Sequence, residues 1–106
     1  MTHFVYILKC ADGSYYTGST HDLSQRVEQH QSGLIQGYTS SRLPVELVWH
    51  QEFPAKNEAF LLERQIKGWS RAKKEALIRE DWDTIHQIVK HERIARDAKS
   101  QKKNER

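Results

Sequence analysis

The sequence predicts an α+β domain in which a three-stranded antiparallel sheet is flanked by helices, in the order β-β-α-β-α-α. Two short segments rich in aromatic and β-branched residues, 3–9 and 15–19, are separated by the turn sequence Ala11-Asp12-Gly13-Ser14, which is typical of a β-hairpin. Helical spacing follows in residues 23–31, and a third strand-like segment, residues 45–53, precedes two further helical ones.

The turn between the first two strands decides which side chains share a face of the sheet. A two-residue turn would place Tyr6 and Tyr16 on opposite faces. A three-residue turn that ends at a left-handed Gly13 would pair Tyr6 with Gly18 and Tyr16 with Leu8, and would place both phenols on one face. We predict the three-residue turn.

The first helix has clear signals at both ends. Asp22 can accept a hydrogen bond from a free backbone amide near Gln25, and Gly33 is a natural stop, so we expect a helix over residues 23–31. One stripe of this helix mixes apolar and basic side chains: Leu23, Arg26, Val27 and His30. Burying a guanidinium is costly without a partner, so the stripe predicts a helix that directs charge at a ligand. The alternative is an Arg26 that reaches solvent and a His30 that belongs to the core.

The C-terminal half is predicted to be mainly helical. Pro54 ends the third strand, and residues 55–68 then form a helix. Its core stripe is Ala59, Leu62, Ile66 and Trp69, with Glu63 at the edge of the stripe. A short helix is expected from Ser70 to about Arg79. A fourth would start at Asp81 or Asp83 and face the body with Trp82, Ile85, Ile88 and Val89.

Composition limits the kinds of protein this chain can be. The sequence has 106 residues with one cysteine, Cys10, which we expect to be a small buried apolar side chain. The longest apolar run, residues 4–8, is too short to span a bilayer. We therefore expect a cytoplasmic protein with no membrane segment and no organic cofactor. The expected parts are a domain over residues 1–80, a C-terminal helix over residues 81–97, and a basic, disordered tail over residues 98–106.

Positive charge is concentrated near the C-terminus. Residues 90–106 hold seven Lys and Arg against three acids, and a second basic cluster runs from Arg64 to Arg79. Such segments favour a polyanion such as nucleic acid, although a solvated charged face is the simpler alternative. The loop over residues 32–44 adds an aromatic and a cation, which could stack a base and hold a phosphate or could only pin the loop to the body. The expected nucleic-acid contacts are Tyr38, Thr39, Arg42, Lys67, Arg71, Lys73 and Lys74.

Several of these residues together resemble a known family. Two tyrosines ten apart across a hairpin are followed by Arg26, by His30 one turn later and by Glu63 on the helix after the third strand. With the tripeptides Phe4-Val5-Tyr6 and Tyr16-Thr17-Gly18, this set resembles the GIY-YIG nuclease family, in particular its small single-domain bacterial members. The resemblance covers residues 3–80 and implies the GIY-YIG fold.

The resemblance also implies a chemistry, the metal-dependent hydrolysis of phosphodiester bonds in DNA. Glu63 would be the only protein ligand of Mg²⁺ or Mn²⁺, and Tyr16 or Tyr6 would accept a proton from the attacking water. Arg26 would grip the scissile phosphate, and His30 would orient the tyrosine or the water. Without the family context, Glu63 could simply pair with Lys67 one turn on.

We therefore predict a DNA nuclease, structure-selective and linked to repair or recombination, with RNA left open as a substrate. A protein partner could supply specificity. The first motif reads FVY rather than GIY, and Ser19 stands where several family nucleases have a lysine. The alternative function is a nucleic-acid-binding adaptor whose catalytic site is weak or vestigial.

Overall fold

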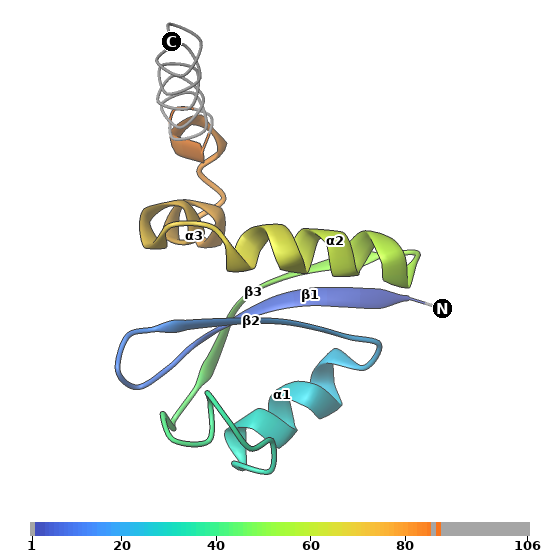
Figure 1. Ribbon diagram of the computed structural model, residues 1–106, viewed down its shortest axis with the longest axis vertical. Helices are drawn as coiled ribbons and strands as arrows, with labels where there is room; N and C mark the ends of the chain where they lie inside the picture. Colours follow the sequence, from blue (N-terminus) through green and yellow to red (C-terminus); the bar gives the residue numbers. More distant parts are fainter. Residues whose placement is uncertain (1, 86, 88–106) are drawn as a thin grey trace, which may run out of the picture. The chain divides into compact units, whose positions relative to one another are not determined.

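Three antiparallel strands form a sheet in the order β2-β1-β3, so the first strand of the chain is the central one (Figure 1). The structure is a computed structural model and describes residues 2–85 and residue 87. The strands are β1 (His3–Lys9), β2 (Tyr15–Thr20) and β3 (Glu46–Phe53). The predicted α+β class and antiparallel sheet are confirmed. Only the end of β2 and the start of β3 differ from the expected bounds, by one residue each.

The β1–β2 hairpin has the predicted register. Tyr6 pairs with Gly18, and Leu8 pairs with Tyr16. Gly13 has a φ of 85°, and its amide donates to the carbonyl of Cys10 over 2.9 Å. This left-handed position closes the three-residue turn that the sequence favours, because a side chain there would be strained. Both tyrosines therefore lie on the same face of the sheet.

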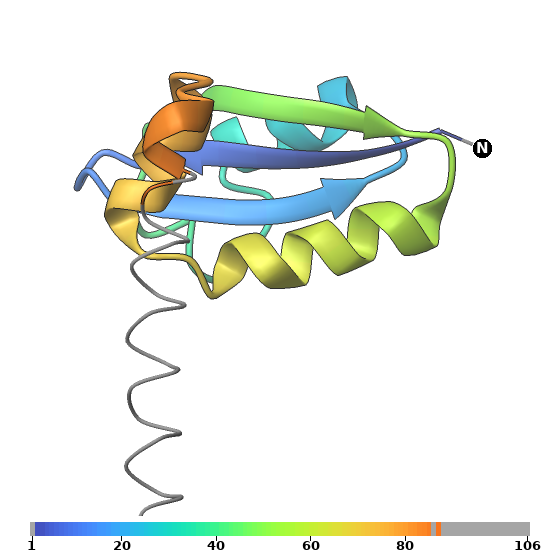
Figure 2. The same cartoon turned by 90° about the horizontal axis from the view of Figure 1, so that it is seen from above.

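The two faces of the sheet are covered by different helices (Figures 1 and 2). The helix α1 (Leu23–Gln31) covers the face that carries Tyr6 and Leu8, and it packs Leu23 and Val27 against them. The helix α2 (Lys56–Lys67) covers the other face, toward which the strand alternation directs Val5 and Ile7. The central strand is thus buried on both sides, which explains its continuous apolar sequence.

The helix starts follow the predicted capping residues. Asp22 accepts a hydrogen bond from the Gln25 amide over 3.1 Å and begins α1. Ser70 accepts from the Lys73 amide over 3.3 Å and begins α3 (Arg71–Ile78). Asp81 accepts from the Thr84 amide over 3.2 Å, and residues 82–85 are helical.

The described residues fall into two compact units, divided between Trp69 and Ser70. In the second unit, Ile85 is buried as expected, whereas Trp82, which was expected to be covered as well, is 55% exposed. An i, i+3 spacing in so short a helix does not decide which of the two apolar residues is buried. The expected positions of Ile88 and Val89, most of the predicted helix over residues 81–97 and the tail over residues 98–106 lie outside the described residues.

The hydroxyl of Thr17 gives a first prediction. This side chain is 3% exposed, and its Oγ1 has no hydrogen-bond partner among the described residues. Valine has nearly the same shape and no polar atom to bury, so Thr17→Val should raise the free energy of unfolding by about 1 kcal/mol. Urea denaturation of both proteins measures the difference. A loss of stability would mean that the hydroxyl has a partner in solution.

Candidate active site

Tyr6 lies at the centre of the candidate site and is fully buried. Its ring crosses over its cross-strand partner, Gly18. A Cβ atom built on Gly18 would lie 2.5 Å from the Tyr6 hydroxyl oxygen and 2.6 Å from Cζ. Glycine at this position therefore leaves the space that the phenol occupies, which explains the glycine of the Tyr16-Thr17-Gly18 motif in physical terms.

His30 joins Tyr6 to the loop that follows α1. It lies in the last turn of α1, where its side chain is 1% exposed. The Tyr6 hydroxyl oxygen is 2.9 Å from His30 Nε2, and the Thr39 hydroxyl oxygen is 2.8 Å from His30 Nδ1. Thr39 is 2% exposed, and its side chain is buried against His30. The side chain is therefore not available for the contact with nucleic acid that the sequence had suggested.

The surroundings of Tyr6 hold its proton in place. Burial raises the pKa of Tyr6 well above its ordinary value, and the neighbouring Tyr16 raises it further. The positive charge of Arg26 opposes this rise in the Tyr6 pKa, whereas the negative charge of Glu63 adds to it. Burial, and then the charge of Arg26, lowers the pKa of His30. The pair is therefore a neutral phenol beside a neutral imidazole.

Tyr16 extends the cluster toward the surface. Its ring centroid lies 5.1 Å from that of His30 and 6.3 Å from that of Tyr6. Tyr38 stacks on Tyr16 with centroids 6.2 Å apart and an interplanar angle of 28°. The Arg42 guanidinium carbon in turn lies 3.8 Å from the centre of the Tyr38 ring. Tyr16 is partly exposed, unlike Tyr6 and His30.

Arg42 ties the loop to the hairpin turn. Its Nε donates to Asp12 Oδ2 over 3.1 Å, and its Nη1 donates to the carbonyl of Tyr38 over 2.8 Å. The Ala11 amide also donates to the Arg42 carbonyl over 2.9 Å. The sequence indicated the aromatic and the cation of this loop. It gave no sign that Asp12, which reads as an ordinary turn residue, would be the partner of Arg42.

Glu63 lies on α2, which covers the other face of the sheet, and its charge contributes to the raised pKa of Tyr6. Its side chain is 11% exposed, and its Oε2 lies 3.1 Å from the Nζ atom of Lys67, so the pairing with Lys67 that the sequence allowed is present. The Glu63 carboxylate already binds one positive charge, the ammonium of Lys67. A carboxylate oxygen is also a ligand that hard divalent cations prefer, so Glu63 is suited to hold such an ion. Among residues 2–85 and 87, no group of three or more His, Cys, Asp or Glu gathers to hold a metal. Water and substrate oxygens would have to supply the other ligands of an ion at Glu63.

The remaining basic residues differ in how well they could meet nucleic acid. In the second unit, the Arg71 side chain is 56% exposed, and its Nε lies 3.7 Å from Glu75 Oε1. Lys73, by contrast, is only 7% exposed. Burial lowers the pKa of Lys74. Lys67 is half exposed while paired with Glu63. The structure therefore leaves Lys73, like Thr39, unsuited to a direct contact with nucleic acid.

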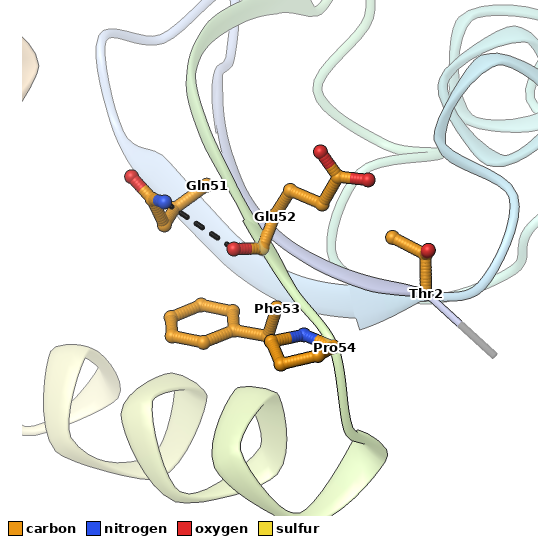
Figure 3. Close-up of a pocket in the computed structure, with 5 residues that line it drawn as sticks. All are labelled: Thr2, Gln51, Glu52, Phe53 and Pro54. Carbon is orange, nitrogen blue, oxygen red and sulfur yellow. Dashed lines mark hydrogen bonds between the residues drawn. The ribbon is translucent and has the colours of Figure 1, made fainter.

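A separate pocket of about 350 Å³ lies at one end of the sheet. In Figure 3 the Glu52 and Phe53 side chains point to opposite sides of β3, as the strand alternation requires. The pocket is lined by Thr2, Gln51, Glu52, Phe53 and Pro54, and by none of the residues of the tyrosine cluster.

Comparisons with known proteins agree with this geometry. Residues 2–76 match the family model described as the GIY-YIG catalytic domain. A UPF0213 protein of Bacillus pumilus is 49% identical over 78 residues, which cover 74% of this chain and 80% of that protein. A UPF0213 protein of Staphylococcus aureus is 48% identical over 79 residues, which cover 74% of this chain and 96% of that protein.

Solved structures give the same result. The solution structure of a UPF0213 protein from Bacillus halodurans is 48% identical, with a TM-score of 0.50, and the match covers 74% of this chain and 84% of that one. A protein from E. faecalis is 33% identical, with a TM-score of 0.53, over 76% of this chain and 85% of that one. Within the described residues, no helix is long and apolar enough to cross a membrane. With its matching catalytic-domain model, its UPF0213 relatives and its paired tyrosines, this chain belongs to the GIY-YIG family.

Proposed function

We propose that this chain is a metal-dependent nuclease that hydrolyses phosphodiester bonds in DNA. The observation that carries the proposal is the buried pair of Tyr6 and His30, whose hydroxyl oxygen and Nε2 lie 2.9 Å apart, with the ring of Tyr16 packed beside both. The charges of Arg26 on α1 and of Glu63 on α2 both influence the pKa of Tyr6, in opposite directions. A phosphate held beside this pair would meet a positive donor and a metal-binding group together.

Arg26 is suited to grip the phosphate. It lies on α1 one turn before His30, and it is partly exposed rather than fully buried. Its forked donors can bind two phosphate oxygens and stabilise the charge that develops during hydrolysis. Because His30, one turn further along α1, contacts the Tyr6 hydroxyl over 2.9 Å, a phosphate bound by Arg26 would lie next to the tyrosine cluster.

Glu63 is suited to hold the metal. Mg²⁺ or Mn²⁺, when bound there, supplies positive charge that stabilises the developing negative charge on phosphate oxygens and acidifies water. The carboxylate is held by α2 in a nearly buried position, so it is oriented before an ion arrives. When an ion binds, the Lys67 ammonium must give up its contact with Glu63 Oε2. The Lys67 side chain is half exposed, so it can turn toward a phosphate or toward solvent.

Tyr16 is the better candidate for accepting a proton from water. Tyr6 is fully buried, its pKa is raised, and its hydroxyl is engaged by His30. Tyr16 is partly exposed and lies against His30 and Tyr38. We therefore assign the proton transfer to Tyr16 and a supporting role to Tyr6.

We further propose that the protein selects its substrate by backbone shape, in a repair or recombination setting, with a protein partner supplying further specificity. Contacts to phosphates carry no sequence information, and cationic side chains make binding strongly dependent on salt. Tyr38, Arg42, Lys67 and Arg71 have exposed surface suited to this role. Arg42 would act mainly by holding Tyr38, since Asp12 and the Tyr38 carbonyl already occupy two of its nitrogens.

The proposed role of Tyr16 predicts a specific kinetic effect. Tyr16→Phe keeps the ring that packs on His30 and Tyr38 but removes the hydroxyl, so the single-turnover rate of DNA cleavage should fall about 10²–10⁴-fold. The dissociation constant for DNA should change little. Tyr15→Phe is the matched control, because the neighbouring phenol faces the opposite side of β2. Equal rates for wild type and Tyr16→Phe would remove Tyr16 from the proton transfer.

A further inference from the structure

We propose that Thr39 is a positioning residue that holds His30 in the tautomer with its proton on Nδ1, and thereby makes Tyr6 donate its hydrogen to His30 Nε2. This inference rests on the proposed nuclease function only for its kinetic consequence. The hydrogen-bond arrangement itself stands on the contacts among buried side chains.

Three side chains from three different segments form one buried chain of hydrogen bonds. Tyr6 comes from β1, His30 from the last turn of α1, and Thr39 from the loop that follows. The two distances along the chain are 2.9 Å at Nε2 and 2.8 Å at Nδ1. All three side chains are at most 2% exposed. Hydrogens for these bonds must therefore come from within the chain of residues rather than from bulk solvent.

A neutral imidazole carries one proton, so only two arrangements are possible. In the first, Tyr6 donates to Nε2 and Nδ1 donates to the Thr39 oxygen. In the second, Thr39 donates to Nδ1 and Nε2 donates to the Tyr6 oxygen.

The relative strength of the two hydroxyl donors favours the first arrangement. A phenol is a stronger hydrogen-bond donor than an aliphatic alcohol, and an unprotonated imidazole nitrogen is a strong acceptor, so the 2.9 Å contact at Nε2 is best made by the Tyr6 hydrogen. The positive charge of Arg26 acts on the same hydroxyl and strengthens it as a donor. The Thr39 oxygen then accepts the hydrogen of Nδ1 over 2.8 Å.

Thr39 has the features needed to fix this arrangement. Its hydroxyl can accept from Nδ1 and can rotate its own hydrogen elsewhere, whereas the Tyr6 hydrogen is confined to the plane of the ring. The loop around Thr39 is itself anchored: the Arg42 amide donates to the Thr39 carbonyl over 3.0 Å, and Arg42 is bound to Asp12. The imidazole that Thr39 holds packs against Tyr16 with ring centroids 5.1 Å apart. Thr39 thereby fixes the orientation of both tyrosines without touching substrate.

The first test is the tautomer of His30 in the intact wild-type protein. Two-bond ¹H–¹⁵N NMR correlations distinguish an imidazole protonated at Nδ1 from one protonated at Nε2. We expect His30 to be protonated at Nδ1. A predominantly Nε2-protonated His30 would overturn the proposal, whatever the enzyme activity, and this measurement needs no variant.

The second test compares two substitutions of Thr39. Thr39→Val keeps the shape but cannot accept from Nδ1, so the His30 proton should shift to Nε2 and the single-turnover cleavage rate should fall about 10–100-fold, with an unchanged dissociation constant for DNA. Thr39→Ser keeps the acceptor and should restore both the tautomer and most of the rate. A merely structural role would lower the stability of Thr39→Val but leave the tautomer of His30 as in wild type, and that result would contradict the proposal.

The two readouts separate this inference from the proposed function. If His30 has the expected tautomer and the wild type cleaves no DNA, the nuclease function fails and the positioning role of Thr39 stands. If the wild type cleaves DNA and Thr39→Val cleaves at the same rate, the nuclease function stands and the positioning role is refuted.

Discussion

Replacing Glu63 by glutamine should reduce metal-dependent DNA cleavage about 10²–10³-fold while leaving the protein folded. Glutamine has nearly the same shape and can still accept a hydrogen bond from Lys67, so the nearly buried position on α2 remains filled. What it loses is the negative charge, which is the property that a hard cation needs from its ligand. Single-turnover cleavage in the presence of Mg²⁺ or Mn²⁺ measures the effect.

Two further measurements show whether the loss arises from metal binding. The affinity for Mn²⁺, followed by electron paramagnetic resonance in the absence of DNA, should fall in Glu63→Gln. Glu58→Gln removes an exposed carboxylate from the first turn of the same helix and should leave both the affinity and the rate near those of wild type. Unchanged Mn²⁺ affinity in Glu63→Gln would show that Glu63 serves α2 through Lys67 and not the metal.

Gly18→Ala should damage both the fold and the site, although it adds only one methyl group. The new Cβ would lie 2.5 Å from the Tyr6 hydroxyl oxygen, and Tyr6 is fully buried, so the ring has no open space into which it can move. We expect a destabilisation of about 1–3 kcal/mol from overpacking. Displacement of the hydroxyl should also break its 2.9 Å contact with His30 and lower the cleavage rate at least about 100-fold.

Gly68→Ala is the matched control for this substitution. Gly68 follows α2 with a φ of −86°, which any residue can adopt, and a Cβ there would make only an ordinary contact at 3.5 Å. This variant should be neutral or slightly more stable, by up to about 1 kcal/mol. Urea denaturation and cleavage assays on both variants decide the matter. A Gly18→Ala protein as stable and active as Gly68→Ala would mean that Tyr6 does not occupy the position described.

Local sequence rules were sufficient to predict the β1–β2 hairpin and the helix α1. The hairpin register follows from the length of one turn and the left-handed Gly13, and α1 follows from the Asp22 cap and the stripe of Leu23 and Val27. Because the alternation of a strand is regular, the register also predicted that Tyr6 and Tyr16 share one face. That His30 would orient a tyrosine was implied by the family resemblance and not by local rules.

The contacts made by the loop could not be predicted in this way. Thr39 and Arg42 lie in an irregular segment, where spacing along the chain does not determine direction. Their partners, His30 and Asp12, are 9 and 30 residues away in sequence. Thr39 was therefore expected to contact nucleic acid, whereas it is buried against His30. The burial of Lys73 was missed because a charged residue on a short helix is ordinarily exposed.

The most direct test of the nuclease proposal is the cleavage of labelled DNAs by the wild-type protein. A panel of single-stranded, duplex, flap and four-way-branched molecules is incubated with Mg²⁺ or Mn²⁺, with a chelator and with Glu63→Gln as controls. We predict metal-dependent cleavage of at least one structured DNA, abolished by the chelator and nearly abolished in the variant. Tight binding across the panel without cleavage by either protein would contradict the account and would favour an adaptor that binds nucleic acid without cutting it.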